Sequence, residues 1–406
     1  MAPIEREQTM MAEMRMMGLD PMGDIRSLGY EYHNDRLVQV GSNRGYEFKG
    51  ADEYDALAEA VSQYIPLLLE EEAGLSPLWL PLGVTPGEGC PIFASRGYEQ
   101  AEKLLLIIQG SGRVLAGVWG CSLCINENLD HGTMMPYLQK ASEAGYGVIV
   151  FNPNQNCVEG KQVPGSETFE RHVAYVMDKV VMAHCAAAEI DILAHSHGGR
   201  ALIQYLGRSS LDRSAAMLAR KIRHIAFTDS YHSHGQLGQL PPLIRALLND
   251  PQRCMNFVPH SSPVGTQVTE WLSQEYTFTA AEKGCACTST GILDHASTNY
   301  AAMEAVFDLL DAQRIPVASG LCPAPVLQIR RSLTGVEELE TSPFRIAQNQ
   351  VVEQPPLEAN PSFEANPGLE SKLMPQKHRK GPWPQMSKIK KLLSRSSSRN
   401  NMVSPV

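Results

Sequence analysis

A serine followed closely by two glycines interrupts an apolar segment near the middle of the chain. Residues 190–199 read Ile-Asp-Ile-Leu-Ala-His-Ser-His-Gly-Gly, so the apolar run stops abruptly at Ser196. A strand that enters a tight turn and continues as a helix exposes a nucleophilic serine above a parallel sheet, and small neighbours are needed because the turn backbone is strained. The pattern G-x-S-x-G reads Ala194-x-Ser196-x-Gly198 here. Ser196 is therefore the candidate nucleophile, and the alternative is that it only caps the following helix.

A carboxylate and a histidine follow later apolar runs. Asp229 comes after the run 221–227, and His295 lies on a loop before a helix predicted over residues 300–310. A nucleophilic serine needs a histidine that accepts its proton and a carboxylate that holds this histidine in the correct tautomer. The chain order Ser, Asp, His is the one that α/β-hydrolases use. We predict a triad of Ser196, His295 and Asp229.

Other side chains compete for these roles. Four further histidines are candidate bases: His195, His197, His232 and His234. The first two flank the serine but point elsewhere on a tight turn, and the last two follow Asp229 too closely to be positioned separately. For each histidine, His295 included, a surface-loop position without catalytic function is the alternative. Asp294 replaces Asp229 as the acid only if its loop folds back.

A glycine-flanked turn follows the apolar run 104–108. Its backbone N–H groups at Ser111 and Gly112, together with that of His197 after the serine, form the candidate oxyanion hole. The alternative is an ordinary tight turn.

Strands and helices must alternate to bring these groups together. The predicted strands cover residues 104–108, 147–151, a run starting at 190, 221–227, 254–258 and 285–288. The predicted helices cover residues 54–69, 170–188, 200–206 and 300–310. Continuous apolar strands imply helices on both faces of a sheet. The fold class is therefore α/β, a doubly wound and mostly parallel sheet whose functional groups collect at the carboxyl ends of its strands.

Composition limits the classes of protein. The chain has 406 residues, of which 43% are hydrophobic and 19% charged, which favours one main domain with peripheral tails. The nine cysteines are scattered, and the start of the chain has no continuous apolar core, so we expect a reducing compartment and no secretory signal. No apolar run approaches the roughly 18 residues that cross a bilayer, so no membrane association is expected.

Metal and nucleotide sites are not indicated. The pairs Cys121-x-x-Cys124 and Cys285-x-Cys287 lack the flanking spacing of a zinc site. The turn at Gly110-x-Gly112 lacks the third glycine of a dinucleotide fingerprint, and there is no phosphate-binding loop. We expect neither a cofactor nor a metal.

The chain changes character after residue 312, where prolines interrupt any periodicity. Nine basic and no acidic residues follow Glu370, leaving 26 Lys and Arg against 44 Asp and Glu in the remainder, so the tail carries about +9 and the body about −18. We expect a flexible segment over residues 1–26, a domain over 27–312 and a disordered Pro-rich linker with a basic Ser/Arg tail over 313–406. The tail is typical of a nuclear-import signal, a nucleic-acid contact or a phosphorylation switch, with simple solubilisation as the alternative.

Roughly residues 27–312 resemble the Arb-type domain family of Argonaute-binding cotranscriptional regulators. The resemblance is most specific over residues 143–154 and 194–199. It is also carried by residues 29–30, 54–72, 104–119 with the glycine turn, 126–136, 228–230 and His295. It implies an α/β-hydrolase-like fold and a nuclear role in small-RNA-linked heterochromatin formation or splicing. The implied partners are Argonaute-type, chromatin or splicing proteins, with small RNA contacted indirectly or through the basic tail.

The resemblance also implies a hydrolase activity at Ser196, but the chain departs from the family pattern. Gln109 stands where relatives usually have a histidine, and His197 stands where an aromatic residue is frequent. We interpret the chain as a divergent paralogue. A regulatory scaffold ranks first, and an active serine esterase or amidase ranks second. We expect the protein in the nucleus, with the cytoplasm as a further location.

Overall fold

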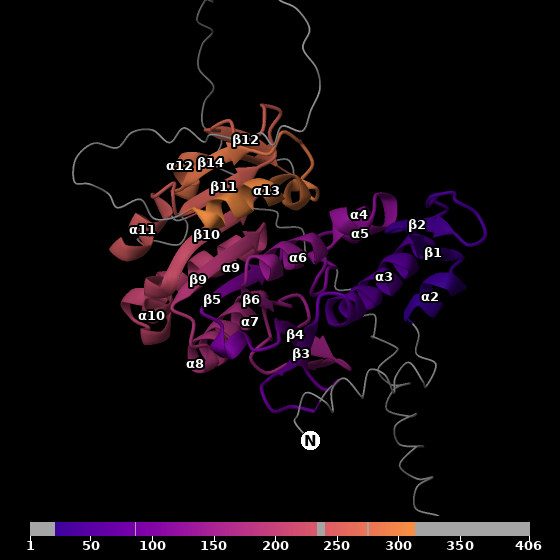
Figure 1. The fold of residues 1–406 in the computed structure, drawn as a ribbon, viewed down its shortest axis with the longest axis horizontal. Coiled ribbons are helices and arrows are strands. Elements are labelled where there is room, and N and C mark those ends of the chain that lie inside the picture. The colour runs from indigo at the N-terminus through magenta and orange to yellow at the C-terminus, as the bar shows by residue number, and fades with distance from the viewer. Residues whose placement is uncertain (1–20, 86, 234–239, 274–275, 313–406) are drawn as a thin grey trace, which may run out of the picture. The chain divides into compact units, whose positions relative to one another are not determined.

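The computed structural model describes residues 21–312 except residues 86, 234–239 and 274–275 (Figure 1). The expected linker and tail over residues 313–406 lie outside the described residues, as does most of the expected N-terminal segment. Helix α2 (Pro21–Ser27) falls across the boundary expected at residue 27, and its Ile25 is buried.

A large twisted sheet forms the centre of the domain. Its strands are β3 (Leu75–Leu80), β4 (Cys90–Ser95), β5 (Lys103–Ile108), β6 (Gly147–Val150), β9 (Glu189–His195), β10 (Ile222–Thr228), β11 (Cys254–Val258) and β14 (Ala286–Ser289). Within the described ranges these eight strands lie in the order β14-β11-β10-β9-β5-β6-β4-β3. Neighbours from β14 to β6 are parallel, whereas β4 and β3 pair antiparallel. The predicted mostly parallel α/β sheet is confirmed.

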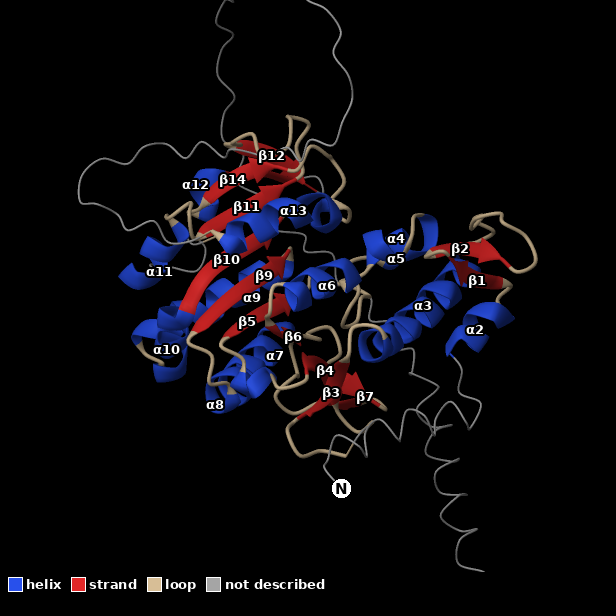
Figure 2. Cartoon of the chain, in the orientation of Figure 1, coloured by secondary structure: helices blue, strands red, loops and turns tan. Residues whose placement is uncertain are grey.

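Helices pack on both faces of this sheet (Figure 2). They are α6 (Met135–Glu143), α7 (Phe169–Tyr175), α8 (Met182–His184), α9 (His197–Gly207), α10 (Arg213–Lys221), α11 (Pro242–Leu248) and α13 (Thr298–Asp311). Side chains alternate along a strand, so Leu104, Leu106 and Ile108 of β5 join the core with α7, α9, α10 and α11. Leu105 and Ile107 of β5 join a second core with α6 and α13. The sheet is therefore covered on both sides, as the apolar strands predict.

Further helices and strand pairs complete the domain. They are α3 (Ala51–Glu71), α4 (Cys121–Asn126), α5 (Leu129–Gly132), α12 (Ala280–Lys283) and the pairs β1 (Tyr30–His33) with β2 (Arg36–Gln39), β7 (Cys157–Val158) with β8 (Lys161–Gln162), and β12 (Glu270–Ser273) with β13 (Tyr276–Thr279). Helix α3 contains the predicted helix 54–69 and packs its apolar stripe against α2, α4 and the β1–β2 hairpin. None of the helices in the described ranges is long and apolar enough to span a bilayer.

One predicted helix differs in the structure. The sequence predicts a continuous helix over residues 170–188, but α7 ends at Tyr175, a π-helical segment covers Val176–Val181, and α8 ends at His184. Cys185 is extended, and the N–H of Ala186 donates to the carbonyl oxygen of Glu99 at 2.8 Å. This long-range hydrogen bond takes the place of a further helical turn.

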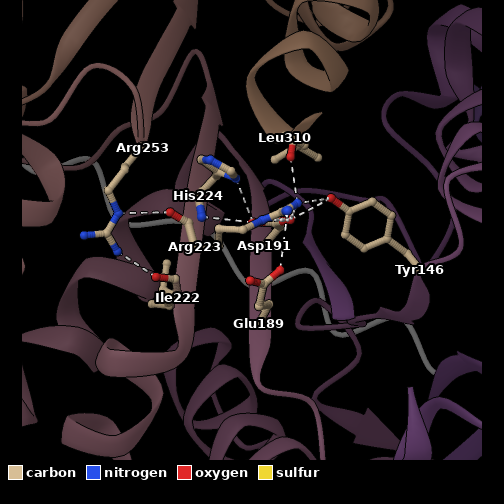
Figure 3. A network of polar contacts seen from close by, with 8 residues as sticks. All are labelled: Tyr146, Glu189, Asp191, Ile222, Arg223, His224, Arg253 and Leu310. Carbon is tan, nitrogen blue, oxygen red and sulfur yellow. Dashed lines mark hydrogen bonds and ion pairs between the residues drawn. The ribbon is translucent and has the colours of Figure 1, made fainter. Parts of the chain in front are cut away.

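A buried ionic network fixes the amino-terminal edge of the sheet (Figure 3). Asp191 on β9 is fully buried and accepts hydrogen bonds from Arg223, from the backbone of His224 and, at 2.6 Å, from the Tyr146 hydroxyl. Arg223 also donates to the carbonyl oxygen of Leu310 at the end of α13, at 2.6 Å. Burial raises the pKa of the Asp191 carboxyl, but the hydrogen bonds from His224, Arg223 and Tyr146 outweigh burial and lower it. The network joins β9, β10, α13 and the start of β6.

Replacing Asp191→Asn removes the charge that compensates the largely buried Arg223 guanidinium. We expect a loss of about 3–5 kcal/mol in the free energy of unfolding, measured with urea at pH 7. Glu189→Gln is the matched control, because Glu189 lies 3.5 Å from the same guanidinium with 54% of its side chain exposed. The control is expected to change stability by less than about 1 kcal/mol. Equal effects of both variants would contradict the assigned role of Asp191.

The lowered pKa of the Asp191 carboxyl predicts a pH dependence of stability. A carboxylate whose pKa is lower in the folded than in the unfolded state stabilises above the unfolded value of about 3.9, and this stabilisation is lost as pH falls through the folded value. The stability difference between the wild type and Asp191→Asn is therefore expected to be constant above about pH 5 and to shrink on acidification. A difference that stays constant down to the acid unfolding limit would contradict it.

Candidate active site

Ser196 lies on the turn between β9 and α9, at the carboxyl-terminal edge of the sheet. Its backbone has φ 51° and ψ −119°, a left-handed conformation that costs a non-glycine residue on the order of 1–3 kcal/mol. Hydrogen bonds hold the turn, since the Ser196 N–H donates to the carbonyl oxygen of Thr228 and the Tyr231 N–H donates to that of Ser196, both at 3.0 Å. The predicted strand, strained turn and helix around this serine are present.

Three glycines allow the backbone to pack around Ser196. A Cβ at Gly110 would lie 3.0 Å from the Ser196 Cβ, and one at Gly198 would lie 2.6 Å from the carbonyl oxygens of residues 108 and 109. A Cβ at Gly199 would lie 1.9 Å from the Ser230 hydroxyl. The loop after β5, the start of α9 and the loop after β10 therefore meet at distances that only glycine permits.

Asp229 follows β10, the neighbour of β9, and is buried with φ 42°. Its Oδ2 accepts from His295 Nδ1 at 2.5 Å and from the Ser273 hydroxyl, and its Oδ1 accepts from Trp271 Nε1 at 3.0 Å. Burial raises the pKa of the Asp229 carboxyl, but the hydrogen bond and charge of His295, with the Ser273 and Trp271 hydrogen bonds, outweigh burial and lower it. The carboxylate is thus ionised and holds the Nδ1 side of His295.

The His295 ring lies beside the strand that carries the serine. Its centroid is 4.8 Å from that of His195, the residue before Ser196, and the two rings are tilted by 30°. Among the residues that the structure describes, no hydrogen bond joins the Ser196 hydroxyl to His295. Such contacts are often long in ligand-free proteins and tighten when substrate binds.

The competing histidines have other partners. His195 Nδ1 contacts the carbonyl oxygen of Thr228 at 2.9 Å, and burial, with the neighbouring His295, lowers the pKa of His195 to about 3. The His197 ring contacts Glu170 at 3.0 Å.

Two further competitors lie after β10. The buried His232 contacts the Ser230 hydroxyl at 2.6 Å and the carbonyl oxygen of Lys283 at 3.1 Å. His234 lies outside the described residues.

Asp294 is bonded into the turn before α13. Its carboxylate accepts from the Ser297 N–H at 2.7 Å and from the Ser297 hydroxyl at 2.6 Å. Asp229 is the carboxylate that contacts His295.

The candidate oxyanion donors differ in their surroundings. Ser111 is exposed, and the Gly112 N–H donates to Asn154 Oδ1 at 3.2 Å. The Asn154 amide in turn donates to the carbonyl oxygens of Gly110 and Val114, both at 2.9 Å, and so holds the turn. His197 is the first residue of α9, where a backbone N–H has no partner within the helix. Its N–H is the donor placed next to the serine.

Sequence reasoning missed the two other donors to Asp229, Trp271 and Ser273. Both lie on β12, which pairs with β13 in a separate two-stranded hairpin that follows β11 and precedes β14 in the sequence. The alternating pattern of Trp271 and Ser273, followed by Tyr276 and Phe278, is the signal that could have predicted this hairpin.

The cysteine pairs are buried. Burial raises the pKa of the Cys124 thiol well above its usual range, and the Cys121 thiol lies 3.1 Å from the Ser62 hydroxyl. In the described part of the chain, no three His, Cys, Asp or Glu side chains are grouped so that they could hold a metal ion.

A mostly parallel sheet with a serine on the turn after β9 and a hydrogen-bonded Asp-His pair after later strands defines an α/β-hydrolase-like domain. The chain belongs to the Arb2 domain family, whose model matches residues 23–162 and 156–264. This match confirms the resemblance to Arb-type domains.

The chain is also similar to individual known proteins. Cotranscriptional regulator ARB2A of Homo sapiens is 28% identical over 327 residues, which cover 67% of this chain and 74% of the relative. The ARB2A homolog of Dictyostelium discoideum is 32% identical over 246 residues, covering 52% of this chain and 62% of the relative. Among solved structures, a histone deacetylase from Saccharomyces cerevisiae matches with a TM-score of 0.40 and 12% identity, over 66% of this chain and all of that chain.

The close packing around Ser196 predicts the effect of adding one methyl group. Gly198→Ala places a Cβ against two carbonyl oxygens, so we expect a loss of about 1–3 kcal/mol in the free energy of unfolding, measured with urea. Gly207→Ala is the control at the other end of α9, where the nearest atom would be 3.5 Å away and φ is −58°. The control is expected to stabilise by about 0.5–1 kcal/mol. Equal unfolding midpoints for the two variants would contradict the packing.

Proposed function

We propose that this protein is a nuclear cotranscriptional regulator that works as a protein-protein scaffold. The observation that carries this proposal is membership of the Arb2 domain family, together with relatives named cotranscriptional regulator ARB2A. The partners we propose are Argonaute-type, chromatin or splicing proteins. A domain of strongly acidic sequence is a poor ligand for a phosphate backbone, so small RNA would be reached through a protein partner or through the basic residues beyond 370.

The scaffold proposal predicts where the protein goes and what it binds. Tagged full-length chain is expected in the nucleus and to co-purify with an Argonaute-type or chromatin protein, whereas a chain ending at residue 370 is expected to lose nuclear enrichment. Ser196→Ala is the control and is expected to keep both properties, because a scaffold does not need the hydroxyl. Exclusively cytoplasmic full-length protein without such partners would overturn the proposal.

The hydrogen bond between Asp229 and His295 favours a second function, a serine esterase or amidase. In this function Ser196 Oγ attacks the carbonyl carbon of an ester or amide while the Nε2 atom of His295 accepts the hydroxyl proton. Asp229 holds Nδ1 and stabilises the imidazolium that forms. The backbone N–H of His197 would donate to the oxyanion, whereas the Gly112 N–H of the predicted turn donates to Asn154 Oδ1.

The remaining steps follow from the same groups. The imidazolium of His295 gives its proton to the leaving alcohol or amine, and water then attacks the acyl group on Ser196 Oγ with His295 as the base. The two functions are compatible, because a fold does not determine a function and a competent site can lie within a scaffold.

Labelling with a fluorophosphonate probe tests the second function, because only an activated serine reacts readily with it. We expect the wild type to be labelled and Ser196→Ala not to be labelled, because the attacking oxygen is gone. We expect His295→Gln to be labelled at least about 100-fold more slowly, the usual share of general-base catalysis. His184→Gln is the control, because this exposed histidine ends α8 and has no role in the proposed reaction. A folded wild type that is not labelled, or labelling that survives Ser196→Ala, would contradict the hydrolase.

A further inference from the structure

The β12–β13 hairpin turns one face toward Asp229. Burial alternates along β12, with Trp271 and Ser273 buried and Glu270 and Leu272 exposed. The hairpin lies beside β14, since Val268 donates to the carbonyl oxygen of Cys287 at 2.9 Å, and Figure 2 shows β12 next to β14 at that edge of the domain. Its inward side chains therefore reach the edge of the sheet where Asp229 lies.

Two of the three side-chain donors to Asp229 come from this hairpin. Trp271 Nε1 donates to Oδ1, and the Ser273 hydroxyl donates to Oδ2, the oxygen that also accepts from His295. The Asp229 side chain is only 1% exposed. A carboxylate at such burial stays ionised only if donors replace its water shell. The hairpin thus supplies the hydrogen bonds that keep the partner of His295 charged and oriented.

Helix α12 packs against the hairpin through Lys283 and through the capping box at its start. Lys283 is 1% exposed, and its ammonium lies 4.0 Å from the centroid of the Phe278 ring and 5.9 Å from that of Trp271. Thr279 and Glu282 form a capping box at the start of α12, which ties the end of β13 to this helix. Cation–π contacts of this kind are stronger when the cation is desolvated. Rotation of Trp271 away from Asp229 would therefore break the hydrogen bond to Asp229 and the contacts of the indole with Phe278 and Lys283.

We propose that Trp271 and Ser273 are positioning residues for the Asp229–His295 pair and set the balance between the neutral and protonated forms of His295. The proposal rests on the proposed hydrolase only for its catalytic consequence. Each donor neutralises part of the negative charge that His295 meets across its hydrogen bond. Removing a donor leaves more negative charge there, which favours the protonated imidazole.

Other titratable groups face the pair and must be separated from the effect of the hairpin. They are His195 from β9, Tyr231 from the loop after β10, and Lys283 from α12. The pKa of His195 is about 3, and burial raises the pKa of Tyr231, so both stay neutral at physiological pH. Burial lowers the pKa of Lys283. The Lys283→Met variant measures how much this side chain contributes to the protonation of His295.

The test is an NMR titration of the His295 ring in the full chain with labelled histidine, assigned with His295→Gln. Ser273→Ala and Trp271→Phe are expected to move the titration midpoint of the ring upward by on the order of one pH unit. Ser273→Thr keeps the hydroxyl and is expected to restore the wild-type midpoint. Leu272→Ala, on the exposed face of the same strand, is expected to leave it unchanged.

The outcomes separate the two proposals. Midpoints of folded Ser273→Ala and Trp271→Phe equal to that of the wild type would overturn the positioning role, whatever the activity. An upward shift in a protein that the fluorophosphonate probe does not label would support the positioning role and refute the hydrolase. In a labelled protein, the pH midpoint of the labelling rate is expected to rise together with the NMR midpoint.

Discussion

The buried carboxylate of Asp229 is the constraint on which the candidate site depends. An ionised carboxylate without water requires donors, and here three side chains from two separate parts of the chain supply them: Trp271 and Ser273 on β12, and His295 on the loop before α13. Satisfying this one group therefore fixes the loop after β10, the β12–β13 hairpin and the loop before α13 relative to one another. The position of His295 beside the serine strand is a consequence of that requirement.

A second buried carboxylate, Asp191, lies near the amino ends of the strands and also needs hydrogen-bond donors in place of water. Asp191 has no exposed side-chain surface, and Arg223, His224 and Tyr146 supply its donors. This network ties the amino ends of β9 and β10 to the end of α13, the helix whose start follows the His295 loop. The two buried carboxylates thus lie at opposite ends of β9 and β10, the strands that lead to Ser196 and Asp229, and the strained serine turn lies at the same end as Asp229.

Apolar strands and the serine turn could be predicted because their signals are local. The run 104–108 and the sequence around Ser196 each predict a strand and the point where it ends from fewer than about ten neighbouring residues. The contacts of Asp229 with Trp271 and Ser273 span 42 and 44 residues, and no local pattern encodes such a pairing. The antiparallel strands β3 and β4, interrupted by prolines, and the end of the helical segment at His184 likewise depend on tertiary hydrogen bonds.

A crystal structure of the full chain after treatment with the fluorophosphonate probe would test the central claim, that one constellation joins the serine turn to the Asp229–His295 pair. The account predicts a phosphonyl group on Ser196 Oγ, with one of its oxygens accepting from the backbone N–H of His197 and the Nε2 atom of His295 facing Oγ. A phosphonyl group on another residue, or a His295 ring hydrogen-bonded away from both Asp229 and Ser196, would contradict it.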